Sequence, residues 1–73
     1  MEYRTTEQFN EICNSAINGN WSVAFKECVE YGFYANDLIN KFEESDGMSG
    51  LEATDLTILA EGANDFRHEE LNN

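Results

Sequence analysis

Apolar residues recur at helical spacing in four segments of this chain, and no proline interrupts them. The first segment carries them one and two turns apart, on a single helix face: Phe9, Ile12, Cys13, Ala16 and Ile17. The second repeats that spacing: Trp21, Ala24, Phe25, Cys28 and Val29. Two further stripes follow: Ala35, Leu38, Ile39 and Phe42, then Leu56, Leu59, Ala60, Ala63 and Phe66. The pattern predicts an all-α fold, a small bundle of three to four short helices.

Capping and turn residues divide the first two helices. Thr5 and Gln8 have the spacing of a capping box, which predicts a helix start just after Thr5. Asn20 follows Asn18-Gly19 and can cap the next helix. Gly32 is placed to end that helix, because glycine adopts the left-handed conformation without steric cost. The short connection between these helices predicts that they pack antiparallel.

The last two helices carry similar signals. The third helix is predicted to begin near Ala35 or Asn36 and to end by residues 45–47. Ser49 and Glu52 have the spacing of a second capping box, at the start of the last helix. Gly62 falls inside the last apolar stripe, where glycine costs about 1 kcal/mol relative to alanine. It indicates a kink or a close contact between helices.

With 73 residues, the chain is expected to form one domain over residues 1–73, with frayed ends at 1–4 and 72–73. Its hydrophobic content of 41% suffices for a core and argues against disorder. We find neither a secretory signal nor a membrane-spanning run, so the expected location is the cytoplasm. In that reducing compartment Cys13 and Cys28 are expected to be free thiols buried in the core.

The formal net charge is −11 at pH 7, and it is unevenly distributed. Residues 43–73 hold nine acids and one base, Arg67, which is −8 of the total. Such a charge repels phosphate backbones and anionic lipid surfaces, so direct nucleic-acid binding and membrane binding are not expected. A protein with a basic surface is the partner type that this charge favours.

Five acids of the C-terminal part form the predicted partner-binding face: Glu52, Asp55, Glu61, Asp65 and Glu69. Glu61, Asp65 and Glu69 stand at i, i+4 and i+8, which stacks them on one helix face. Like charges at this spacing destabilise a helix by a few tenths of a kcal/mol per pair. Two interpretations stay open: a merely solvated face, or a surface that imitates nucleic acid. Acids at i and i+4 lie about 6 Å apart along the axis, which is sparser than the roughly 3.4 Å of a DNA strand.

The sequence offers no catalytic, metal-binding or cofactor-binding set. His68 stands alone near the C-terminus, where a solvent-exposed histidine is the expected interpretation. Two cysteines and one distant histidine do not have zinc-site spacing. Length, acidity and helices resemble acyl carrier proteins, whose prosthetic group joins the serine of an Asp-Ser-Leu motif. Ser49 has neither neighbour of that motif, so we interpret it as a helix cap.

Three aromatic residues flank Gly32: Tyr31, Phe33 and Tyr34. A small core cannot bury all of them together with Trp21 and Phe25, so some must close the end of the bundle while others are exposed. Because tyrosine is enriched at binding hot spots, we predict Tyr31 or Tyr34 as an apolar anchor for a partner or a homodimer contact.

The segment from Asn18 to Ile39 resembles small proteins of tailed phages, and the whole chain is similar in type to acidic phage inhibitors of host defence. That resemblance implies an anti-restriction or anti-CRISPR type of inhibitor in the host cytoplasm. We therefore expect a non-enzymatic protein that docks on a basic surface of a nuclease, polymerase or defence complex. The alternative is a small module that sequesters a ligand in a pocket lined by residues 31–34, or carries an acyl group on Ser49.

Overall fold

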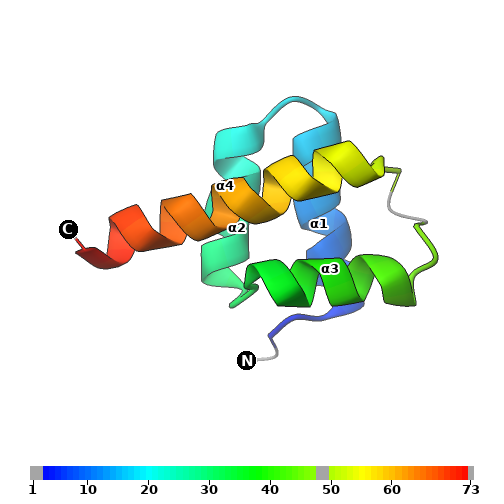
Figure 1. The fold of residues 1–73 in the computed structure, drawn as a ribbon, viewed down its shortest axis with the longest axis horizontal. Coiled ribbons are helices and arrows are strands. Elements are labelled where there is room, and N and C mark those ends of the chain that lie inside the picture. Colours follow the sequence, from blue (N-terminus) through cyan, green and yellow to red (C-terminus); the bar gives the residue numbers. More distant parts are fainter. Residues whose placement is uncertain (1–2, 48–49, 73) are drawn as a thin grey trace.

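The computed structural model describes residues 3–47 and 50–72, and within them it contains four α-helices and no strand. The helices are α1 (Thr6–Ile17), α2 (Trp21–Glu30), α3 (Ala35–Glu44) and α4 (Ala53–Asn72), as Figure 1 shows. The predicted all-α bundle is therefore confirmed. The last helix is longer than expected, with 20 residues against 10 or 12 in the others.

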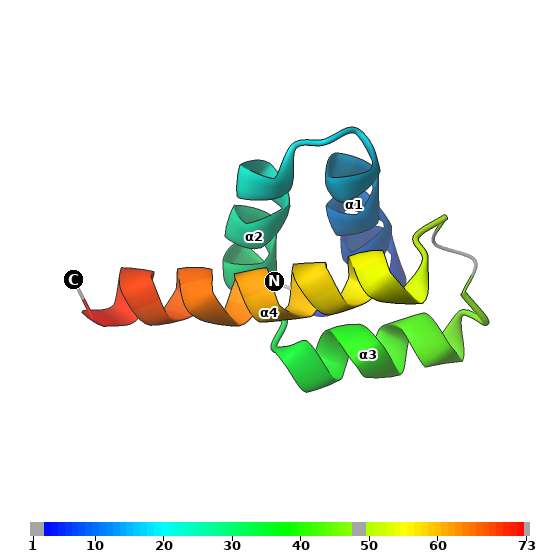
Figure 2. The same cartoon turned by 45° about the horizontal axis from the view of Figure 1, so that its top comes forward.

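The helices form two antiparallel pairs that cross. Helices α1 and α2 lie side by side, as their short connection predicts, while α3 runs alongside α4 and both cross the first pair (Figures 1 and 2). Helix α4 makes its most extensive contact with α2 and a smaller one with α3. Its C-terminal end extends past α2, away from the other helices (Figure 2).

Local hydrogen bonds explain where the first two helices begin and end. The Thr5 capping box is present: the Thr5 hydroxyl accepts from the backbone N–H of Gln8, and the Gln8 side chain accepts from that of Thr5. Asn20 occupies the N-cap position of α2, but its side chain makes no capping bond. At the end of α2, Gly32 has φ +77°, and the N–H of Phe33 donates to the Cys28 carbonyl at 2.8 Å. This C-cap directs Phe33 into the core.

The core is built where the apolar stripes meet. Its largest fully buried side chains come from all four helices and the turn after α2: Phe9, Ile12, Cys13, Cys28, Phe33, Leu38 and Leu59. Both cysteines are buried thiols outside any disulfide, as predicted. The Phe9 and Phe33 rings lie 6.3 Å apart between centroids, so the residue that follows the Gly32 turn packs on α1.

Two stripe residues predicted to be buried are exposed. Ile17 is 50% exposed because it ends α1 at the edge of the bundle, with its Cδ1 next to Gly50. Ile39 is 40% exposed because α3 is covered mainly by α4, which buries Leu38 fully and only one narrow face of α3. Each stripe therefore identified the inner face correctly and overestimated its width.

The start of α4 also differs from the prediction. Ser49 lies outside the described residues, but the helix begins at Ala53, later than a cap at Ser49 would place it. Gly50 has φ +85°, which is not helical, and the Glu52 carbonyl accepts the first bond of the helix, from Leu56. Gly62 marks a close helix contact: a Cβ built on it would overlap the ring of Phe25 on α2. Of the two interpretations of Gly62, a kink or a close contact between helices, the structure therefore supports the close contact.

Candidate functional site

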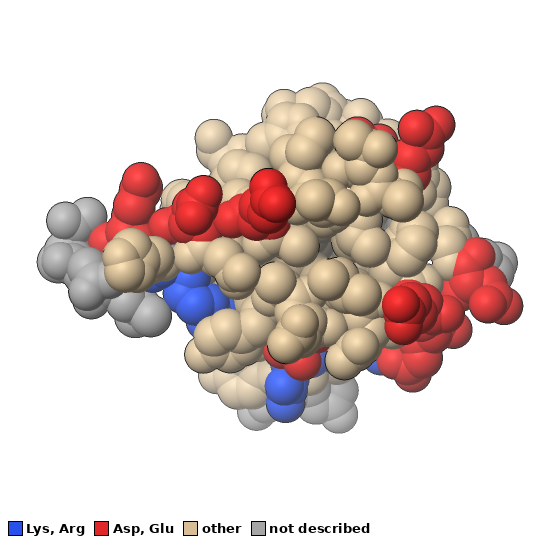
Figure 3. All heavy atoms as spheres, viewed as in Figure 1, with Lys and Arg blue, Asp and Glu red and all other residues tan. Residues whose placement is uncertain are grey.

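Three of the predicted acids form a row on the outer face of α4. Glu61, Asp65 and Glu69 are all exposed. At 3.6 residues per turn, Glu61 and Asp65 fall on the side opposite the buried Leu59 and Ala63, and Glu69 lies about 80° around the helix from Leu59. Figure 3 shows acidic atoms in a line that follows the C-terminal half of α4. Within residues 3–47 and 50–72, ion pairs join Arg4 to Asp37 and Lys41 to Glu44, and none involves these three acids. We call these three residues the acidic row.

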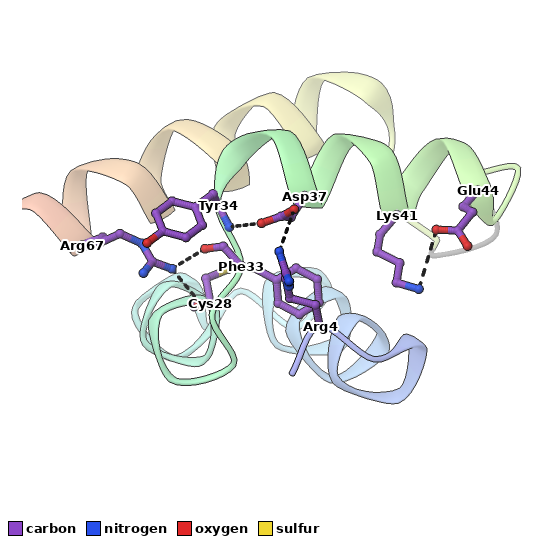
Figure 4. A network of polar contacts seen from close by, with 8 residues as sticks. All are labelled: Arg4, Cys28, Phe33, Tyr34, Asp37, Lys41, Glu44 and Arg67. Carbon is purple, nitrogen blue, oxygen red and sulfur yellow. Dashed lines mark hydrogen bonds and ion pairs between the residues drawn. The ribbon is translucent and has the colours of Figure 1, made fainter. Parts of the chain in front are cut away.

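Arg67, the one base after residue 42, leaves α4 on the side away from the acidic row. Its guanidinium donates to the backbone carbonyls of Cys28, at 3.3 Å, and of Phe33. Its Cζ lies 3.9 Å from the centroid of the Tyr34 ring, in a cation–π contact (Figure 4). Arg67 therefore joins α4 to the turn after α2, and its charge serves the fold instead of neutralising the acidic row.

The inward placement of Arg67 was not predicted, although the sequence carries a signal for it. Arg67 stands four residues after Ala63 and seven after Ala60, so it continues the buried stripe of α4 by one turn. A long side chain at such a position can bury its stem and direct its charged end to polar groups at the edge of the core. Here those groups are the backbone carbonyls of Cys28 and Phe33.

Glu52 and Asp55 do not extend the acidic row. Glu52 precedes α4 and is exposed, while Asp55 is half-buried in the first turn, where a negative charge complements the helix dipole. Asp55 lies six residues before Glu61, which places the two about 120° apart around the helix. In Figure 3, uncharged atoms separate the acidic row from the acidic atoms at the other end of this face. Glu52 and Asp55 therefore lie outside the acidic row.

Tyr31 and Tyr34 lie at the turn after α2 and have different surroundings. The Tyr31 hydroxyl donates to the Glu11 carboxylate on α1, and this hydrogen bond is the main cause that raises the pKa of Tyr31 to about 12. The Tyr34 ring is 54% exposed and carries the Arg67 guanidinium on one face. Arg67 leaves α4 on the side away from the acidic row, so Tyr34 lies on that side too.

Three further features are His68, the Cys28 thiol and a hollow at Tyr34. His68 is exposed, as expected, and Ser49 lies outside the described residues. Burial is the main cause that raises the pKa of the Cys28 thiol to about 12 from its ordinary value of 9.0, while Arg67 lowers it, so the thiol is protonated at neutral pH. A surface hollow of about 310 Å³ includes Tyr34, together with Tyr3, Arg4 and Gly32.

The described residues contain neither a metal-binding cluster nor a membrane-spanning helix. Among residues 3–47 and 50–72, no group of three or more His, Cys, Asp or Glu side chains is placed to hold a metal ion. None of the helices described is both long enough and apolar enough to cross a bilayer. The acidic row is thus the candidate site with the best-defined geometry.

No protein-family model, curated protein or solved structure matches this chain.

Proposed function

We propose that this chain is a non-enzymatic interaction protein whose acidic row docks on a basic surface of a nucleic-acid-handling protein and blocks it. The partner class is a nuclease, a polymerase or a defence complex of a host cell. The protein acts without a cofactor, as an inhibitor of the phage type. Glu61, Asp65 and Glu69 supply the charge that the partner recognises.

One observation carries the proposal: the ion pairs between described residues do not involve the acidic row, although a base is present on the same helix segment. Glu61 with Asp65, and Asp65 with Glu69, each repel by a few tenths of a kcal/mol. Arg67 stands beside them in sequence but is used elsewhere in the fold. A folding cost without a compensating contact in the chain itself is consistent with a surface that is neutralised by a partner.

The dimensions of the acidic row suit a track of basic residues. From Glu61 to Glu69 the helix rises about 12 Å, since each residue adds about 1.5 Å. A DNA strand presents roughly four phosphates over that length, at about 3.4 Å each. Three carboxylates can therefore occupy part of a phosphate-binding surface, while the row is too short and too sparse to imitate a duplex by itself.

Affinity capture from the source cell tests this proposal with three forms of the protein. The first is wild type and the second is Glu61→Gln with Asp65→Asn and Glu69→Gln. The third is a matched control with Glu7→Gln, Glu43→Gln and Asp46→Asn, exposed acids that are not part of α4. Each triple variant removes three negative charges, so both change the net charge from −11 to −8.

We expect wild type and the control to retain a nucleic-acid-handling protein that salt elutes, and the row variant to lose it. Steering by a charged surface weakens steeply with ionic strength, which explains the salt elution. Equal capture by all three forms, or capture that salt does not affect, would contradict the proposal. A wild-type chain that sediments as a dimer through this face would instead make a second copy the occupant.

A further inference from the structure

A groove lies between α2 and the C-terminal half of α4. It encloses about 380 Å³ and is lined by Lys26, Val29, Glu30, Phe66 and Glu70. Val29 and Phe66 are half-buried and form its apolar part, and the three charged residues are exposed. A volume of this size falls at the lower end of the range for small-ligand sites and exceeds what a water molecule needs.

The groove adjoins the acidic row. Glu69 stands three residues after Phe66, a spacing that makes two side chains neighbours on a helix, so α4 presents the end of the acidic row beside the groove. Two of the three charges at the groove are negative, from Glu30 and Glu70, and Lys26 is the one base there. The ion pairs between described residues, Arg4–Asp37 and Lys41–Glu44, leave these three charges out. An apolar hollow therefore lies beside a surface of predominantly negative charge.

We infer that this groove receives the apolar side chain of an amphipathic basic helix, whose Lys or Arg residues contact Glu30, Glu70 and the acidic row. The inference rests on the proposed function and adds the kind of segment that the partner presents. Residues three or four apart on a helix lie about 5–6 Å from each other, so a helix places apolar and basic side chains together on neighbouring faces. Charge complementarity selects the basic helix over an uncharged or acidic one.

Removing the charge of Lys26 should change binding in a direction that depends on the charge of the occupant. It is the only groove residue that repels a basic partner, so Lys26→Gln should strengthen binding by about two- to threefold, the size of an exposed charge contact. An uncharged occupant would not respond to this change, and an acidic one would bind more weakly. Because Lys26 is exposed, its replacement does not disturb the core.

The probe is a fluorescently labelled amphipathic helix of leucine and lysine, whose binding is followed by anisotropy. A peptide with the same residues in a scrambled order keeps the charge and loses the apolar face, and a leucine and serine peptide keeps the face and loses the charge. We expect the amphipathic basic peptide to bind about tenfold more tightly than either, since it alone gains from both the groove and the acids.

Protein variants then locate the contact. Phe66→Ala should remove most of the preference for the amphipathic peptide, while Phe42→Ala, which alters a half-buried aromatic ring on α3, should preserve it. Circular dichroism of each variant shows that the helices persist. If Phe66→Ala does not fold, Lys26→Gln decides the matter, with Asn10→Asp as a control of equal charge change on α1.

The two proposals fail in different ways. Equal binding of the amphipathic and scrambled peptides would overturn the groove inference, and the proposed function would stand if neutralising the acidic row still weakened both. Tighter binding of the leucine and serine peptide would assign the groove to an uncharged ligand and overturn the inference. If neutralising the acidic row left the affinity for every peptide unchanged, the proposed function itself would be contradicted.

Discussion

Gly62→Ala should destabilise the protein, although helix propensity alone predicts that it stabilises it. Gly62 lies ten residues into the 20-residue α4, and its backbone is helical, so alanine should stabilise the helix by about 1 kcal/mol on propensity alone. A Cβ at this position, however, would lie 3.0 Å from Cε2 of Phe25 and closer still to Cε1 and Cζ of the same ring.

The overlap should outweigh the propensity gain. Forcing an extra methyl group into a packed contact costs about 1–3 kcal/mol. The expected net effect of Gly62→Ala is therefore a loss of about 1 kcal/mol in the free energy of unfolding. In a Phe25→Ala background the ring is gone, and the same substitution should stabilise by about 1 kcal/mol. The two sites are thus expected to couple by about 2 kcal/mol.

Urea unfolding followed by circular dichroism measures all four corners of this cycle, provided that the slope with urea stays constant. Asn64→Ala, at an exposed position on the same helix, reports the propensity effect without the overlap. If Gly62→Ala stabilises the wild-type protein and the Phe25→Ala protein equally, the close packing of α2 on α4 is not as described and the reasoning fails.

Four further predictions concern Arg67, Cys28, Tyr31 and the acidic row. Arg67→Ala should destabilise by about 1–3 kcal/mol in urea unfolding because it removes two charge-assisted hydrogen bonds, and Arg67→Lys should recover little of this loss since lysine lacks the planar guanidinium that stacks on Tyr34. Between pH 9 and pH 10, ionisation of the unfolded Cys28 thiol should lower stability by about 1.4 kcal/mol per pH unit, because the folded thiol, with a pKa of about 12, stays protonated; Cys28→Ala should remove this contribution and leave that of Tyr31 above pH 10. Absorbance at about 295 nm should reveal one tyrosine that titrates near pH 12, and Tyr31→Phe should abolish that step. Neutralising the acidic row should stabilise the fold by roughly 0.5–1 kcal/mol at low salt and by less at high salt, as thermal or urea unfolding would record.

The sequence predicted the helices well because their signals are local. The Thr5 capping box and the glycine after α2 each depend on a few neighbouring residues, and both hold in the structure. Periodicity also placed the inner face of every helix. It could not give the width of that face, which depends on how many neighbours cover the helix, and so Ile17 and Ile39 were assigned to the core wrongly.

The candidate site was predictable only in part. The stacking of Glu61, Asp65 and Glu69 follows from helical geometry alone, and the structure exposes all three. The environment of Tyr31 and Tyr34 depends on Glu11 and Arg67, which lie 20 and 33 residues away in the sequence. Such pairings arise from how the helices cross, which a single sequence does not encode in any local pattern.

The association rate constant with the captured partner shows whether the acidic row steers binding. It is to be measured by surface plasmon resonance at about 50 mM and about 500 mM salt, where the Debye length falls from roughly 14 Å to 4 Å. For wild type and the matched control we predict a rate that drops by about tenfold or more with salt. The row variant should already be slow at low salt and change little. If the row variant matches wild type in both rate and salt dependence, the acidic row is only a solvated face.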